Sequence, residues 1–236
     1  KAIELYSQVN SGTNAIYSQR RVSQIMVALD KRDAARVHLK RFGQKHPKFT
    51  QDMLIAEADL LQSLGKNSEA LSLYEDLILS YPNEYQFSLR YAEILLNEGR
   101  NSEALKEYEV LAKRFPKNAT ILNAYGYLLT DYSKDFRKAI KLIKKALKIE
   151  PGNPAIMDSY GWALFRLGKY DQALKELKKA YYVYKDPEIA AHIVELLWET
   201  EQKEKARIFY LKAKEGFPDS GYLIKLNNKY FNLGEG

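Results

Sequence analysis

The feature that most constrains this chain is a sequence repeat with a period close to 34 residues. Prolines recur at intervals of 35, 34 and 35 residues, at Pro47, Pro82, Pro116 and Pro151. An alanine stands twelve residues before each of them and recurs further along the chain; the set is Ala35, Ala70, Ala104, Ala139, Ala173 and Ala206. Such a period predicts one small structural unit used several times, each copy packing on its neighbours.

Each copy has the internal pattern of two helices joined by a short turn. A small residue, which allows two helices to approach closely, lies twelve or thirteen positions before the alanine: Ala58, Ala92, Gly126 and Gly161. Glycines at the predicted turns, Gly65, Gly99 and Gly168, permit the left-handed backbone that ends the first helix. A bulky residue follows the alanine by four positions, as at Tyr74 and Leu177. The proline then stops the second helix, since it lacks the amide donor.

This pattern resembles the tetratricopeptide repeat family over nearly the whole chain. The resemblance implies an all-α, right-handed superhelical solenoid of about six repeats. We place the repeats within 15–218, at 16–49, 51–84, 85–118, 119–153, 154–186 and 187–218. Residues 1–14 read as the second helix of a truncated upstream repeat, so we expect further sequence before Lys1. Residues 219–236 read as a capping helix and tail, with the closing helix over 220–233 and Leu223, Leu226 and Tyr230 on one side.

A narrower resemblance rests on residues 154–164 and 186–192, within a similar region that runs from Asn123 to Ala206. These stretches resemble bacterial outer-membrane tetratricopeptide lipoproteins, one of which is an adaptor for a periplasmic carboxyl-terminal processing protease and its cell-wall hydrolase substrates. The resemblance implies a periplasmic protein anchored through a lipid-bearing cysteine before Lys1. A cytoplasmic location is the alternative.

Composition and motifs argue against several other classes. The chain has no cysteine, which excludes disulfides and thiolate metal sites. No apolar run approaches the roughly 18 residues needed to span a bilayer. We find no phosphate-binding loop, nucleophile elbow or metal-binding spacing of histidines. His192 and Glu195 fit a solvated or locally hydrogen-bonded pair better than a metal site. We therefore expect neither an enzyme nor a bound cofactor or metal.

Family geometry predicts which first-helix positions line the concave groove. Over the last three repeats these positions supply the predicted peptide-binding residues Asn123, Tyr127, Asp158, Trp162, Phe165, Arg166, Glu195 and Trp198. Large aromatic rings give much contact area for few frozen torsions, so they suit a bound peptide. Asn123 can hydrogen-bond a ligand backbone, and Asp158 and Glu195 can attract basic side chains. For Phe165 and Trp198 the alternative is packing between repeats or under the closing helix.

The charges predict two different faces on this basic chain, whose net charge is +7. The groove positions carry two bases, Arg20 and Arg166, and eight acids: Asp52, Asp59, Glu93, Asp131, Asp158, Glu188, Glu195 and Glu199. Many lysines, such as Lys141 and Lys178, fall on second helices. Our leading hypothesis is a scaffold that binds a partner peptide or helix in the groove. The alternatives are a self-assembling scaffold of an envelope complex, and a convex face that binds an anionic surface or nucleic acid. An ordinary solvated face explains those lysines more simply than nucleic acid does.

Overall fold

The structure, a computed structural model, describes residues 1–12 and 14–231. These ranges contain fourteen α-helices and no β-strand, so the predicted all-α fold class is confirmed. The chain divides into two compact units, Lys1–Arg100 and Asn101–Gly236. The division falls inside the predicted third repeat, and the assignment of the helices to six repeats stays a prediction. Over the described ranges, no helix combines the length and the apolarity required to cross a membrane.

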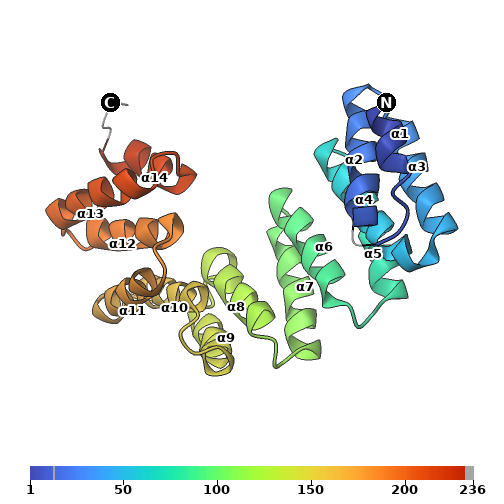
Figure 1. Cartoon of the computed structure of the whole chain (residues 1–236). Coiled ribbons are helices and arrows are strands. Elements are labelled where there is room, and N and C mark those ends of the chain that lie inside the picture. The colour runs from blue at the N-terminus through green and yellow to red at the C-terminus, as the bar shows by residue number, and fades with distance from the viewer. Residues whose placement is uncertain (13, 232–236) are drawn as a thin grey trace. The chain divides into compact units, whose positions relative to one another are not determined.

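The first unit consists of helices that follow one another as antiparallel pairs (Figure 1). Helix α1 is short, and α2 with α3 forms the first complete hairpin. A 3-10 turn, Pro47–Phe49, leads into the next pair. The bounds are α1 Ala2–Ser7, α2 Asn14–Ala28, α3 Arg32–Lys45, α4 Thr50–Ser63, α5 Asn67–Ser80 and α6 Tyr85–Asn97.

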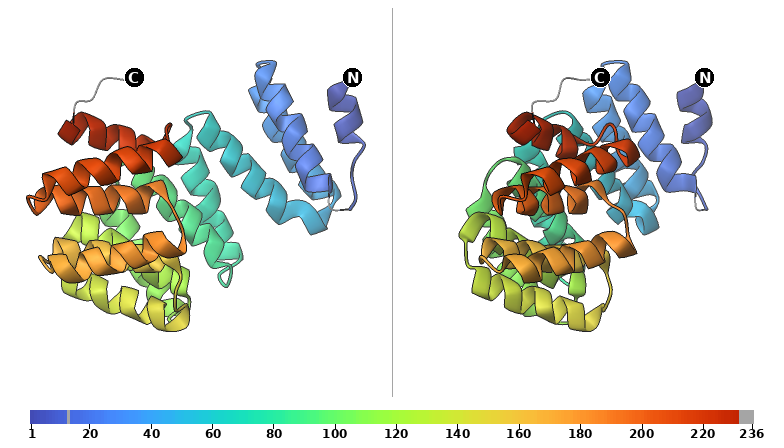
Figure 2. Two further views of the ribbon diagram at one scale, coloured as in Figure 1. Left: turned by 60° about the vertical axis from the view of Figure 1, so that its left-hand side comes forward. Right: turned by 90° about the vertical axis from the view of Figure 1, so that its left-hand side faces the viewer.

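The second unit continues the pattern of helices joined by short turns (Figure 2). Its helices are α7 Asn101–Arg114, α8 Ala119–Leu128, α9 Phe136–Ile149, α10 Pro154–Arg166, α11 Tyr170–Val183, α12 Pro187–Glu199, α13 Lys203–Gly216 and α14 Gly221–Leu226. Two segments of π-helix, Leu129–Ser133 and Asn227–Phe231, extend α8 and α14.

Most turns between paired helices share one hydrogen-bond pattern. In five of these turns the amide after the left-handed residue bonds a carbonyl five residues earlier, as Lys66 N–H does to the Leu61 oxygen at 2.8 Å. The turn between α8 and α9 differs, because the amide after left-handed Lys134 bonds the Ser133 hydroxyl. Glycine occupies the left-handed position at Gly65, Gly99 and Gly168, as the sequence predicts. Asp30 and Glu201 adopt the same left-handed backbone in turns without glycine. The hydrogen bonds that close the helix therefore outweigh the steric preference for glycine there.

The recurrent positions of the repeat form the core. All six recurrent alanines are fully buried. The bulky residues four positions later, among them Tyr74 and Leu177, are buried too. Gly126 of α8 lies so close to α9 that an added Cβ would stand 2.5 Å from Ile143 Cγ1. The small residue is therefore required by the close approach of two helices.

The closing segment covers the end of the second unit. Leu223 and Leu226 of α14 are buried in the same apolar cluster as Ala206 and Tyr210 of α13. This agrees with the predicted apolar side of the closing helix, and Tyr230 packs against the same cluster. Residues 232 and 233 of the predicted closing helix lie outside the described residues.

Candidate functional site

A groove of about 460 Å³ runs across the first helices of three successive hairpins in the second unit. Helices α8, α10 and α12 form its floor, and the segment between α11 and α12 forms one edge. Its lining residues are Asn123, Ala124, Tyr127, Pro154, Ala155, Asp158, Ser159, Tyr184, Asp186, Glu188 and Ile189. The lining combines apolar surface with several oxygen acceptors. It thus suits a ligand that brings both apolar groups and hydrogen-bond donors.

Asn123, one of the lining residues, has a side-chain acceptor without a hydrogen-bond partner among the residues that the structure describes. Helix α8 is fixed at its start by Asn118, whose side chain accepts a hydrogen bond from Ile121 N–H at 3.1 Å. Asn123 lies just over one turn further on. Its Oδ1 atom is buried and has no hydrogen-bond partner within the described part of the chain. A buried acceptor without a partner is costly, so a donor from a ligand would be stabilising here.

Tyr127 links the two ends of the groove. Its hydroxyl donates to Glu188 Oε1 at 3.3 Å, which joins α8 to α12. Burial raises the pKa of Tyr127 above its usual value, and Asp131, Glu188 and Asp158 raise it further. The hydroxyl therefore stays protonated and continues to donate.

His192 and Asp158 form a buried pair behind the groove. His192 Nδ1 lies 2.9 Å from Asp158 Oδ1, and both residues are buried. Burial by itself lowers the pKa of His192, but Asp158, Glu188 and Asp131 together raise the pKa above its ordinary value. The imidazolium thus compensates the Asp158 carboxylate within the chain. From the sequence we expected Asp158 to attract a basic side chain of a ligand, and His192 to be solvated or paired with Glu195. In the structure these two residues instead pair with each other.

Trp162 packs against the buried pair. Its indole Nε1 donates to Asp131 Oδ1 at 2.8 Å, and its ring stacks on His192 with centroids 4.2 Å apart. Phe165 and Arg166 pack beside the same ring. The centroid of the Phe165 ring lies 5.3 Å from that of Trp162, and Arg166 Cζ lies 5.5 Å from the Trp162 centroid. Only 7% of Trp162 is exposed, so little of its ring is free for a ligand. Its hydrogen bond and stacking hold the helices that carry the groove.

Trp198 and Glu195 lie at a different place, beneath the closing segment. The Trp198 ring stacks on Tyr230 and meets Phe231 edge-on, with both centroid distances at 5.0 Å. Glu195 pairs with Lys229 at 2.8 Å. For Trp198 the structure has the packing under the closing helix that the sequence analysis held as the alternative. Glu195, expected to attract a ligand, has a cation within the chain.

The predicted site residues thus fall into three places. Asn123, Tyr127 and Asp158 line the groove; Trp162, Phe165 and Arg166 stack beside it; Glu195 and Trp198 lie under the closing segment. Whether each contacts a ligand stays a prediction. Within the ranges the structure describes, no three His, Asp or Glu side chains gather closely enough to hold a metal ion.

Sequence reasoning missed Asp186, Tyr184 and the partner of His192. Asp186 precedes Pro187 and caps α12 by accepting from Glu188 N–H at 2.8 Å, a pattern visible in the sequence. Asp158 and His192 are 34 residues apart, as are Glu195 and Lys229. Positions one period apart face each other in adjacent repeats. Pairing charged residues at that separation would have found both contacts.

Two family models match the chain, and both describe the tetratricopeptide repeat. One matches residues 55–119 and 95–154, and the other matches 132–191. Together they run from 55 to 191, which is more than half of the 236 residues. The chain belongs to the tetratricopeptide repeat family. Tetratricopeptide repeat proteins act as scaffolds for protein–protein interaction, with ligands held on the extended surface of stacked repeats.

Known relatives agree with this assignment. A protein of Pseudomonas aeruginosa, "TPR repeat-containing protein PA4667", is 32% identical over 195 residues, which is 83% of this chain. The chain spans 33% of that relative's length. A solved tetratricopeptide repeat protein from Parabacteroides merdae has a TM-score of 0.68 at 15% identity and covers 94% of each chain. The structure of the Cut9–Hcn1 hetero-tetramer has a TM-score of 0.67 at 17% identity. The match covers 97% of this chain and 46% of the chain in that structure. These two structural likenesses establish the fold.

Proposed function

We propose that this tetratricopeptide repeat protein is a non-catalytic scaffold whose groove on α8, α10 and α12 binds an extended segment of a protein partner. The observation that carries the proposal is the buried, unpartnered Oδ1 of Asn123 on the groove lining. A peptide backbone presents N–H donors at regular intervals, and one of them would satisfy this acceptor.

The rest of the lining supports a peptide as the ligand. Pro154, Ala155 and Ile189 offer apolar surface for a side chain. Among the acids of the lining, Asp158 is compensated by His192. The acidic character of the groove therefore comes from Asp186 and Glu188, which lie at one end. We therefore expect a segment with an apolar residue next to a basic one.

The groove can be tested with peptides selected from a random displayed library on the full chain. We predict that Asn123→Ala weakens binding of a selected peptide about tenfold, the worth of one hydrogen bond to a buried acceptor. Tyr127→Ala should weaken it at least as much, since it removes both ring surface and the link to Glu188. The measurement is the dissociation constant by fluorescence anisotropy.

The matched control is Asn97→Ala, at an exposed asparagine near the end of α6. It should leave the affinity unchanged. If Asn123→Ala and Tyr127→Ala both keep wild-type affinity while circular dichroism shows an intact fold, the groove is not the binding site.

We further propose that the partner is a periplasmic carboxyl-terminal processing protease or its substrates, with this chain as a lipid-anchored adaptor. The support is the narrower sequence resemblance at 154–164 and 186–192. Both stretches contribute to the groove, including Asp158 from the first and Glu188 from the second. Binding of the purified protease should be weakened about tenfold by Asn123→Ala, and at least as much by Tyr127→Ala. No binding of that protease to the wild-type chain would refute the adaptor role and leave the peptide groove to the test above.

A further inference from the structure

Helix α9, which contributes no residue to the groove lining, concentrates positive charge. Among its fourteen residues are six cations and no acid: Arg137, Lys138, Lys141, Lys144, Lys145 and Lys148. The neighbouring second helix α11 adds Lys175, Lys178 and Lys179. Helix α12, which lines the groove, carries three acids and no Lys or Arg. Helix α11 also carries Asp171 and Glu176, and Glu176 pairs with Lys179 at 2.8 Å. The cation-rich helix without acids is therefore α9, in contrast to the acidic α12.

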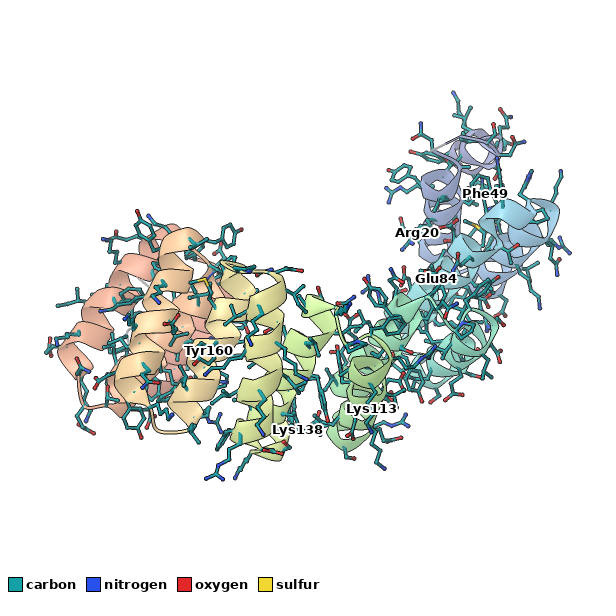
Figure 3. The ribbon with its side chains drawn as sticks, turned by 90° about the horizontal axis from the view of Figure 1, so that it is seen from below. Arg20, Phe49, Glu84, Lys113, Lys138 and Tyr160 are labelled. Carbon is teal, nitrogen blue, oxygen red and sulfur yellow. The ribbon has the colours of Figure 1, made fainter. Side chains whose placement is uncertain are left out.

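The cations of α9 form one stripe. Arg137, Lys141, Lys144, Lys145 and Lys148 recur at helical spacing and are exposed, whereas Ala139, Ile143 and Ala146 face the core. Lys138, labelled in Figure 3, bonds Tyr125 and Glu109. Across the described residues, Lys141, Lys145 and Lys148 belong to no ion pair. Their charge is thus available to an external partner.

Apolar groups lie beside this stripe. Lys144 stands over the ring of Tyr160 on α10, with 5.5 Å from its Nζ to the ring centroid. One turn earlier on α10, Met157 borders a shallow hollow of about 500 Å³, which is completed by Lys175, Lys178, Lys179, Tyr182 and Val183. Tyr182 is 91% exposed and Val183 is 55% exposed. We call this surface the basic face. It consists of the cations of α9 and α11 named above, together with Met157, Tyr182 and Val183.

We propose that the basic face binds the surface of a membrane that contains anionic phospholipids. Clustered lysines are attracted to the negative potential of such a surface. Their aliphatic stems, which line the hollow, can lie against apolar groups while the ammonium groups reach the headgroups. Exposed Tyr182 beside Val183 fits the interfacial layer, where tyrosine is favoured.

The composition of the basic face favours lipid over nucleic acid. Its cations are eight lysines and one arginine, and arginine is the residue suited to bidentate phosphate recognition. Lysine acts as a point charge, which is sufficient for a diffuse layer of headgroups. The hollow, lined by lysine stems, would make no favourable contact with a charged phosphate backbone, but it can accept an apolar acyl chain.

The test is co-sedimentation of the full chain with phosphatidylcholine vesicles and with vesicles of equimolar phosphatidylcholine and phosphatidylserine. We expect binding only to the second kind, and weaker binding as salt is raised. The combined Lys141→Glu, Lys145→Glu, Lys148→Glu variant should partition on the order of a hundredfold more weakly. Tyr182→Ala should weaken the binding that persists at high salt.

The matched control reverses three exposed lysines of the first unit, Lys31, Lys40 and Lys45, to Glu, with the same change in net charge. It should bind vesicles as the wild type does. Equal loss in both triple variants would mean that net charge alone drives binding and would overturn the assignment to the basic face. Absence of vesicle binding by the wild type, or tighter binding to a duplex or single-stranded oligonucleotide, would overturn the lipid proposal. Neither outcome affects the peptide groove.

Discussion

At the scale of single residues, the groove depends on a buried charge pair. Asp158 and His192 are both buried and lie 2.9 Å apart, with the His192 ring stacked on Trp162. Removing one member of such a pair leaves the other charge uncompensated, at a cost of about 3–5 kcal/mol. The pair therefore positions α10 against α12 and keeps the groove floor close to neutral at this point.

The pair should make stability depend on pH. Although burial opposes the charge, Asp158, Glu188 and Asp131 raise the pKa of His192 in the folded protein. Its stabilisation is thus complete below the unfolded pKa of about 6.5 and is lost as pH rises through the folded pKa. We predict that in Asp158→Asn the free energy of unfolding no longer falls as the pH rises through this range. The free energy of unfolding is measured by urea titration at a series of pH values, followed by tryptophan emission.

The control for the pH experiment is His46→Asn. His46 lies in the first unit, with its ring 4.5 Å from the ring of Phe42, and its replacement should keep the wild-type pH dependence of stability. The prediction fails if the difference in unfolding free energy between wild type and Asp158→Asn is constant with pH.

At the scale of elements, close helix contacts explain where small residues occur. Gly126 faces both Ile143 Cγ1 and the carbonyl oxygen of Ala139, which would lie 2.5 and 3.0 Å from an added Cβ. Alanine is better than glycine in a helix by about 1 kcal/mol. Here the clash outweighs that gain, because a β-branched side chain and a backbone atom have little freedom to move.

We predict that Gly126→Ala destabilises the chain by about 1–3 kcal/mol, measured by chemical unfolding. Gly216, at the end of α13, has nothing within 4 Å of the position of an added Cβ. Gly216→Ala should therefore be neutral or slightly stabilising. A stabilised Gly126→Ala variant would show that α8 and α9 can separate at little cost.

At the scale of the molecule, contacts are local, as expected of stacked repeats. Each compact unit has its own core: one cluster includes Leu39 and Met53, and another includes Leu177 and Tyr210. In such arrays each repeat is stabilised by its own interactions and by those with its neighbours. Damage to one unit should therefore leave the other folded.

We predict that Leu39→Ala, which costs about 2–5 kcal/mol at a fully buried site, lowers hydrogen-exchange protection in α2 to α4. Protection in α10 to α13 should stay at its wild-type level, as should affinity for a groove peptide. A uniform fall in protection along the chain would contradict the independence of the two units.

The sequence by itself determined the helical hairpins, the buried alanines and the glycine turns, because a period of 34 residues repeats the same backbone requirements in each copy. It also predicted which helices carry Asn123 and Tyr127. Only the tertiary structure decided that Asp158 pairs with His192 and that Trp198 is covered by Tyr230 and Phe231. The physical reason is that periodicity specifies the face on which a side chain lies. Its partner on the next repeat depends on how closely the two helices pack and on which charge must be compensated once water is removed.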